Sequence, residues 1–201
     1  MECSHDESEK SALQMQLQAA RDGLIRKLEG LGEYDLRRPM TPTGTNLLGL
    51  VKHLAGVEYG YLGEVFERPA PESLSWVEDG TIWQGADMWA TPDESSDYII
   101  GLYHRACAHA DQTIAELHLD ATGEVSWWPE GKRALTLRRA ILRMIGETAQ
   151  HAGHADVVRE LIDGTGGVDY ASFGGEQEWR QYVARVQEAA DRFRDLSAET
   201  G

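Results

Sequence analysis

The residues best suited to chemistry in this chain are a glutamate and two histidines within one predicted helix. Glu147, His151 and His154 stand four and three residues apart, so an α-helix places them on one face. Apolar residues precede and follow them on that face, and the whole stripe reads Ala140, Met144, Glu147, His151, His154, Val158 and Leu161. Such polar groups are costly to bury unless a partner compensates them. A divalent metal ion would do so, because imidazole nitrogen and carboxylate oxygen are ordinary ligands for zinc and related ions.

Apolar residues at helical spacing predict the elements that position this stripe. We expect helices over Glu9–Leu31, Asn46–Glu67, Asp93–Leu117, Thr136–Ile162 and Glu176–Leu196. Thr45 or Asn46 is placed to cap the second of these helices, and Gly164 ends the fourth. No segment reads as a convincing pair of strands. The pattern predicts an all-α protein, a bundle of four long helices with the fifth packed at one end or side.

The segments outside the four helices set the predicted domain organisation. Residues 1–8 are polar and acidic and read as a disordered tail, residues 9–165 as the bundle, and residues 166–201 as an extension with one helix. Two aromatic loops, residues 69–91 and Trp127–Gly131, lie inside the bundle sequence. We expect both at one end of the bundle, as walls of a pocket that Tyr61, Trp83 and Trp127 help to line. Ordinary core packing is the alternative for these aromatic side chains.

Composition excludes several classes of function. The net charge of −15 argues against binding to nucleic acid, which requires a basic surface. No apolar run approaches the ~20 residues that a membrane-spanning helix needs, and the N-terminus does not resemble a signal peptide. The cysteines, Cys3 and Cys107, cannot form a disulfide framework. A reduced, cytoplasmic protein that acts on a small molecule is therefore expected, and the sequence leaves open whether it forms a homodimer.

A further histidine lies on the inner face of the second predicted helix. His53 continues the apolar stripe there, and helical bundles commonly build metal sites from side chains on facing helices. We predict His53, Glu147 and His151 as metal ligands, although His53 alone would read as a hydrogen-bonded core histidine. His154 is either a fourth ligand, a group that contacts a ligand or substrate, or a partner of a neighbouring segment. We place it outside the metal's direct ligands, because a catalytic ion needs an open position.

These two helices carry a family resemblance. Segments Leu47–Glu58 and Glu147–Glu160 resemble the DinB/YfiT-like superfamily, and within it the actinobacterial branch that includes mycothiol-dependent metalloenzymes. The resemblance covers about residues 10–165. It implies an up-down-down-up four-helix bundle with a zinc- or nickel-type ion, bound by one histidine of the second helix and two residues four apart on the fourth. Carried over, these are His53, Glu147 and His151.

Two positions depart from the most common form of the family. Many members have histidine where Glu147 stands, and glutamate there resembles the maleylpyruvate isomerase type, which uses mycothiol. His154 falls where many members have glutamine, which supports placing it outside the direct ligands. The separate C-terminal catalytic domain of the isomerase has no counterpart in the residues after Gly166.

Three functions compete for this site. The first is a thiol transferase, in which the ion favours the thiolate of a low-molecular-weight thiol that attacks a small electrophile. Mycothiol follows only from the resemblance, and no catalytic side chain is assigned. The second is a metal-dependent hydrolase, in which the ion activates water and Glu147 is ligand or general base. The third is a bundle that binds a metal or ligand without catalysis.

Overall fold

The computed structural model describes residues 2–165 and 174–194. The chain divides into two compact units, Met1–Ile162 and Asp163–Gly201, and each is described by itself. In the second unit, helix α8 (Glu176–Asp191) begins where the sequence predicts. It ends at Asp191, and residues 192–194 form a turn, so the helix predicted to reach Leu196 is too long; residues 195–196 themselves lie outside the described part of the chain. Packing of this helix on the bundle stays a prediction.

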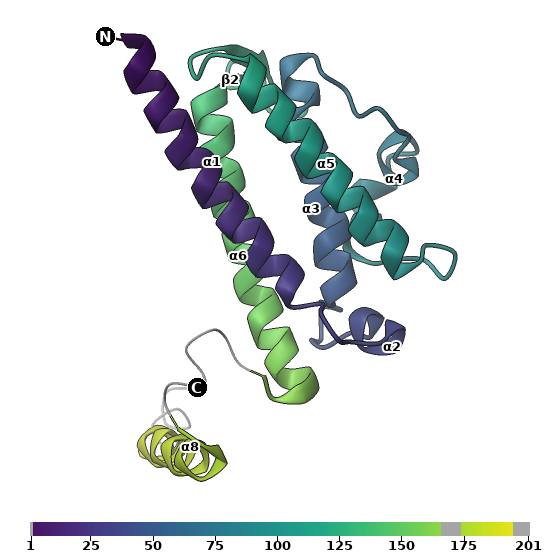
Figure 1. Cartoon of the computed structure of the whole chain (residues 1–201). Coiled ribbons are helices and arrows are strands. Elements are labelled where there is room, and N and C mark those ends of the chain that lie inside the picture. The colour runs from purple at the N-terminus through teal and green to yellow at the C-terminus, as the bar shows by residue number, and fades with distance from the viewer. Residues whose placement is uncertain (1, 166–173, 195–201) are drawn as a thin grey trace. The chain divides into compact units, whose positions relative to one another are not determined.

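The first unit contains four long helices, as expected (Figure 1). They are α1 (Glu2–Arg26), α3 (Leu47–Leu62), α5 (Ser96–Glu116) and α6 (Leu137–Asp163). Figure 1 shows α1 and α6 running one way along the bundle while α3 and α5 run the other way, which is the up-down-down-up order. The all-α prediction is therefore confirmed. Helix α1 begins at Glu2, so its backbone includes residues 2–8, which the sequence assigns to a disordered tail.

Helix α3 begins and ends at identifiable signals. The Asn46 side chain accepts a hydrogen bond from the backbone N–H of Gly49 at 2.7 Å, which confirms the predicted cap. The helix ends at Leu62 before Gly63, so the predicted end at Glu67 is wrong. At Gly63 the backbone closes tightly, because an added Cβ would lie 2.4 Å from the carbonyl oxygen of Tyr59. A short 3₁₀ turn, η1 (Glu64–Phe66), follows.

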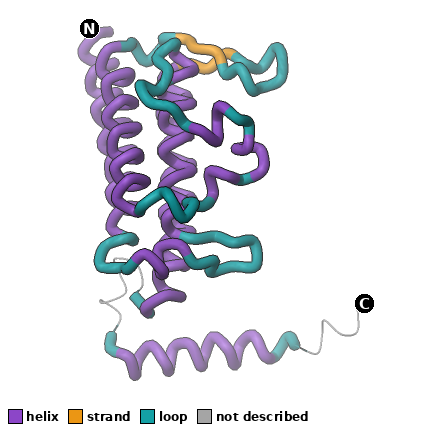
Figure 2. Tube along the Cα trace, turned by 90° about the vertical axis from the view of Figure 1, so that its right-hand side faces the viewer, coloured by secondary structure: helices purple, strands orange, loops and turns teal. Residues whose placement is uncertain are grey.

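The connection between α3 and α5 is long because these two neighbouring helices are parallel. It contains α4 (Ser75–Glu78), η2 (Thr81–Gln84) and η3 (Ala86–Met88), and Figure 2 shows these short turns outside the long helices. We call residues 63–95 the crossover. It runs back from the end of α3 to the start of α5, so the expectation that residues 69–91 stay at one end of the bundle is wrong.

A β-hairpin joins α5 to α6, which the sequence did not predict. Strands β1 (Thr122–Glu124) and β2 (Ala134–Thr136) pair antiparallel with Gly123 opposite Leu135. The loop between them carries the aromatic segment Trp127–Gly131. Glycine is required at position 123, because an added Cβ would lie 2.1 Å from the carbonyl oxygen of Val65. Another short helix, α2 (Glu33–Arg37), lies between α1 and α3.

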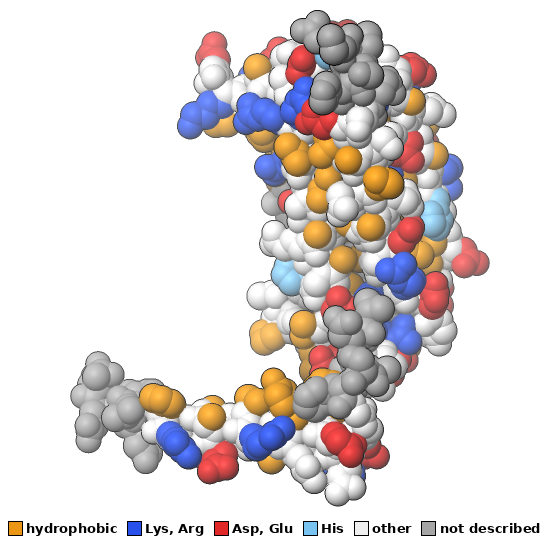
Figure 3. All heavy atoms as spheres, turned by 60° about the vertical axis from the view of Figure 1, so that its left-hand side comes forward, with side chains coloured by type: hydrophobic (Ala, Val, Ile, Leu, Met, Phe, Trp, Pro, Cys, Tyr) orange, Lys and Arg blue, Asp and Glu red, His pale blue; other side chains and the backbone are white. Residues whose placement is uncertain are grey.

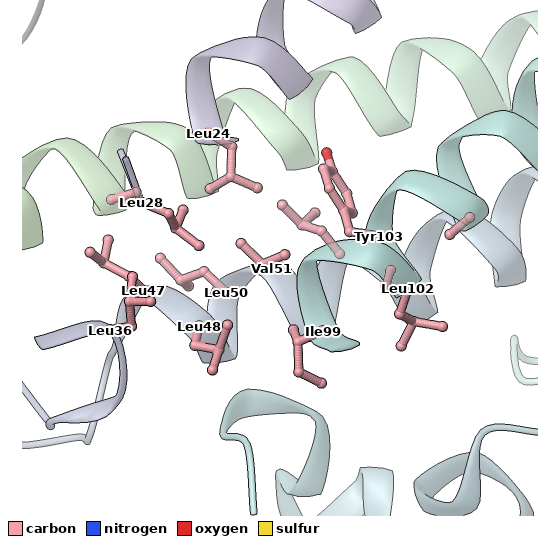
Figure 4. Close-up of a cluster of buried hydrophobic side chains, with 14 of the residues drawn as sticks. Leu24, Leu28, Leu36, Leu47, Leu48, Leu50, Val51, Ile99, Leu102 and Tyr103 are labelled. Carbon is pink, nitrogen blue, oxygen red and sulfur yellow. The ribbon is translucent and has the colours of Figure 1, made fainter. Parts of the chain in front are cut away.

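Apolar side chains of the long helices fill the centre of the bundle. In Figure 4, leucines of α1 and α3 lie toward Ile99, Leu102 and Tyr103 of α5. A second cluster, nearer the hairpin, includes Leu17, Leu62, Ile114, Leu135 and Ile141. On the face shown in Figure 3, apolar side chains gather along the middle, with acidic and basic side chains interspersed around them. No helix in the described ranges is long and apolar enough to cross a membrane.

Candidate metal centre

The structure brings together the three side chains that the sequence proposes as ligands. His53 projects from α3, and Glu147 and His151 project from α6. Oxygen Oε1 of Glu147 lies 3.5 Å from Nε2 of His53 and 3.3 Å from Nε2 of His151. Tetrahedral zinc with bonds of about 2.1 Å separates its ligand atoms by roughly 3.4 Å. The spacing therefore suits one small ion, and one ligand atom from each residue lies within 4.8 Å of the others.

The site lies at the edge of the buried face of α6. Thr148 and Ala155 are fully buried at the centre of that face, while the side chains of His151 and Glu147 are 12% and 28% exposed. The side chain of His53 is 20% exposed. At this depth the three side chains are held in place by the packed helices. They also remain partly exposed, so a small molecule can reach them from solvent.

Burial and neighbouring charges give the two histidines opposite pKa shifts. Burial opposes protonation of His53, but hydrogen bonds and charges of Asp87 and Glu147 outweigh it and raise its pKa. Burial, followed by the charge of His53, lowers the pKa of His151, although Glu147 partly opposes this. His151 is therefore ready to act as a neutral ligand. Metal binding requires a free ring nitrogen on each histidine, so protonation competes with the ion and metal affinity should fall as the pH falls.

His53 has a second partner that the sequence analysis missed. Oxygen Oδ2 of Asp87, on η3, lies 2.6 Å from Nδ1 of His53. Asp87 is only 5% exposed. No sequence signal marks this residue, because it lies in an irregular segment where no periodicity predicts which side chains face the bundle.

His154 lies next to His151 on the side away from Glu147. Its Nδ1 atom is 3.4 Å from Nδ1 of His151, whereas Nε2 of His151 faces Glu147. The ring centroids of the two histidines are 5.4 Å apart, and His154 is exposed. His154 does not belong to the group of three converging ligand atoms. This geometry agrees with a place outside the direct ligands, which stays a prediction.

The proposed pocket residues are only partly brought together. Tyr61 packs edge-on against Trp127, with ring centroids 5.4 Å apart, and the Arg143 guanidinium lies 4.6 Å from the Tyr61 ring. Because Tyr61 and His53 are two turns apart on α3, roughly 12 Å along the axis, this cluster lies beside the metal ligands rather than over them. Trp83 is 76% exposed on η2 and has no ring contact among the described residues. Its role in a pocket stays a prediction.

Comparison with known proteins identifies the family of this chain. A family model described as Mycothiol-S-transferase matches residues 12–164, which include all of the candidate ligands. A search of curated proteins found no match. The family match agrees with the resemblance drawn from the two helix segments. Since it covers most of the sequence, the chain belongs to the Mycothiol-S-transferase family.

Proposed function

We propose that this protein is a metal-dependent S-transferase that joins a low-molecular-weight thiol, of the mycothiol type, to a small electrophile. The observation that carries the proposal is the convergence of His53, Glu147 and His151 on one partly exposed point, in a chain of this family. A divalent ion bound there, zinc or nickel, would favour the thiolate form of a coordinated thiol.

Cys107, one of the two cysteines of the chain, does not compete as the nucleophile. Cys107 is buried in the core on α5, and its Sγ atom lies 3.9 Å from Oε1 of Glu58. Burial, followed by the charge of Glu58, raises the pKa of this thiol, so it stays protonated at neutral pH. A thiol supplied from solution therefore fits the site. In the reaction its sulfur forms a bond to carbon, the carbon–halogen or carbon–oxygen bond breaks, the departing atom keeps the electron pair, and the thiol proton passes to solvent.

The test combines metal analysis with a thiol-dependent assay. Purified protein should contain about one equivalent of divalent metal, which elemental analysis would identify. With a chromogenic aryl halide, turnover should require both the metal and a thiol, with mycothiol compared against cysteine and glutathione. His53→Ala and His151→Ala should lose the metal and the activity. His104→Ala is the matched control, because His104 is exposed on α5 and should retain both.

The alternatives give different results in the same assay. If the protein turns over a hydrolysable ester or amide equally fast with and without a thiol, the site is assigned to metal-dependent hydrolysis. Metal that binds stoichiometrically but supports no turnover of any electrophile would favour a non-catalytic binding role. Either result would overturn the transferase proposal.

A further inference from the structure

The carboxylate of Asp87 contacts the edge of His53 that faces away from the other proposed ligands. Its Oδ2 atom is 2.6 Å from Nδ1, while Nε2 on the opposite edge of the ring faces Glu147 at 3.5 Å. Asp87 is thus not a fourth ligand of the same ion, and it is not part of the converging group. A buried carboxylate in this place accepts a hydrogen bond from Nδ1–H and leaves Nε2 free for a metal.

Helix α3 itself fixes the segment that carries Asp87. The Asn46 side chain donates to the carbonyl oxygen of Met88 at 3.1 Å. At Gly49 the two backbones touch, because an added Cβ would lie 1.9 Å from that same oxygen. Since positions 46, 49 and 53 follow at intervals of three and four, these contacts and His53 share one face of α3.

A buried lysine of α3 also holds the segment that carries Asp87. Lys52 is 2% exposed, and its Nζ atom donates to the carbonyl oxygen of Trp89 at 3.1 Å and to Glu94 at 2.9 Å. The same ammonium group lies 4.3 Å from the centre of the Trp76 ring. The backbone on the C-terminal side of Asp87 is therefore held at two consecutive carbonyls, those of Met88 and Trp89.

We infer that Asp87 is a positioning residue for the metal centre. It holds His53 in the tautomer protonated at Nδ1 and turns Nε2 toward Glu147 and His151. The inference rests on the metal-binding part of the proposed function. Partners of this kind, which orient a histidine ligand and increase its basicity, typically change metal affinity by about 10- to 100-fold. The crossover is thereby part of the metal site, although it supplies no ligand.

The experiment measures Zn²⁺ and Co²⁺ affinity by competition with a chromophoric chelator. Asp87→Asn keeps the shape and an acceptor but loses the charge, and we expect about 10-fold weaker binding. Asp87→Ala loses both, and we expect binding weaker by up to about 100-fold. Both variants should still bind one ion, and the Co²⁺ absorption spectrum should shift because His53 is no longer held. If Asp87→Ala does not fold, the near-isosteric Asp87→Asn carries the test.

Asp79→Asn is the matched control. This aspartate lies in the same crossover, and among the described residues its carboxylate accepts from Thr81 alone, at 2.9 Å from the backbone N–H and 2.7 Å from Oγ1. We expect its metal affinity and Co²⁺ spectrum to equal those of the unmodified protein. Lower thermal stability with unchanged affinity and spectrum in the Asp87 variants would overturn the inference and leave the proposed function standing.

The unmodified protein separates failure of the inference from failure of the proposed function. If it binds no ion, or if His53→Ala binds as tightly, both the metal site and the role of Asp87 are refuted. If it binds an ion with an affinity that depends on Asp87 but transfers no thiol, the inference holds and only the transferase proposal fails.

Discussion

A buried ion pair between α1 and α3 offers the sharpest test of how this bundle is held together. Arg21 is 2% exposed and Glu58 is fully buried. The guanidinium donates twice to the carboxylate, from Nε at 2.7 Å and from Nη2 at 2.8 Å. Its Nη1 atom also donates to Asp111 of α5 at 2.8 Å. One side chain thus connects three of the long helices.

The expected loss in the free energy of unfolding depends on which charge remains buried after the substitution. Removing one partner of a buried pair typically costs about 3 to 5 kcal/mol, because the other charge stays buried without compensation. Burial works against the charge of Arg21, but hydrogen bonding and the charge of Glu58 outweigh it and raise its pKa, so Arg21 stays charged in this protein. In Glu58→Leu, Asp111 remains as a partner, but its side chain is 45% exposed and is screened by solvent. We therefore expect a loss of about 3 kcal/mol.

Replacing both partners should cost less than replacing either one. Arg21→Met with Glu58→Leu removes both buried charges of this pair, and such apolar replacements are often neutral or stabilising. Urea unfolding of the two single variants and the double variant gives the coupling energy directly. Glu124→Gln is the control, because its pair with Arg133 is exposed and should change stability by less than about 1 kcal/mol. Single variants that lose less than about 1 kcal/mol, or a double variant that loses the sum of both, would refute the argument.

Three further predictions concern other parts of the first unit. Gly49→Ala should lower stability by about 1 to 3 kcal/mol and weaken metal binding, because the added methyl group displaces η3; a thermal melt and a metal titration check this. Hydrogen bonds from Ser96 and Arg37 lower the pKa of Glu33 from 4.5 to about 2. The stabilisation from the charged Glu33 is present above pH 4.5 and is lost as the pH falls toward 2. Between pH 4.5 and 2 the urea midpoint of Glu33→Gln should therefore fall less than that of the unmodified protein. His154→Gln should keep the metal, as elemental analysis would show, while its turnover rate or substrate preference changes; loss of the metal would make His154 a direct ligand.

The helices could be read from the sequence because their signals are local. Helix α6 spans Leu137–Asp163, close to the predicted range, and Gly164 takes the positive φ of 75° that a helix end favours. The hairpin could not be read in the same way, since its three-residue strands are too short for an alternating pattern to emerge. Its position depends on the close approach of Gly123 to Val65, which is a tertiary contact.

The prediction that one stripe of α6 faces the core is wrong for part of its length. Glu147 and His151 are partly exposed, His154 is exposed, and Leu161, predicted to face the core, is 57% exposed. Steps of three and four residues match the 3.6-residue turn of a helix only approximately. A series of such steps through Glu147, His151 and His154 therefore moves gradually around the helix, away from the side chains that are buried. The edge position is what leaves the proposed ligands accessible from solvent.

Asp87 shows why the partner of a proposed ligand is harder to predict than the proposed ligand itself. His53, Glu147 and His151 lie on long helices, so spacing alone brings them to facing surfaces. Asp87 reaches His53 only because α3 and α5 are parallel, and a parallel pair requires the chain to return along the bundle. The return path lies against α3 through its N-cap, a glycine and a buried lysine. The topology of the bundle thus supplies both the proposed ligands and the segment that we infer orients one of them, and a change to that segment should alter metal affinity without touching a proposed ligand.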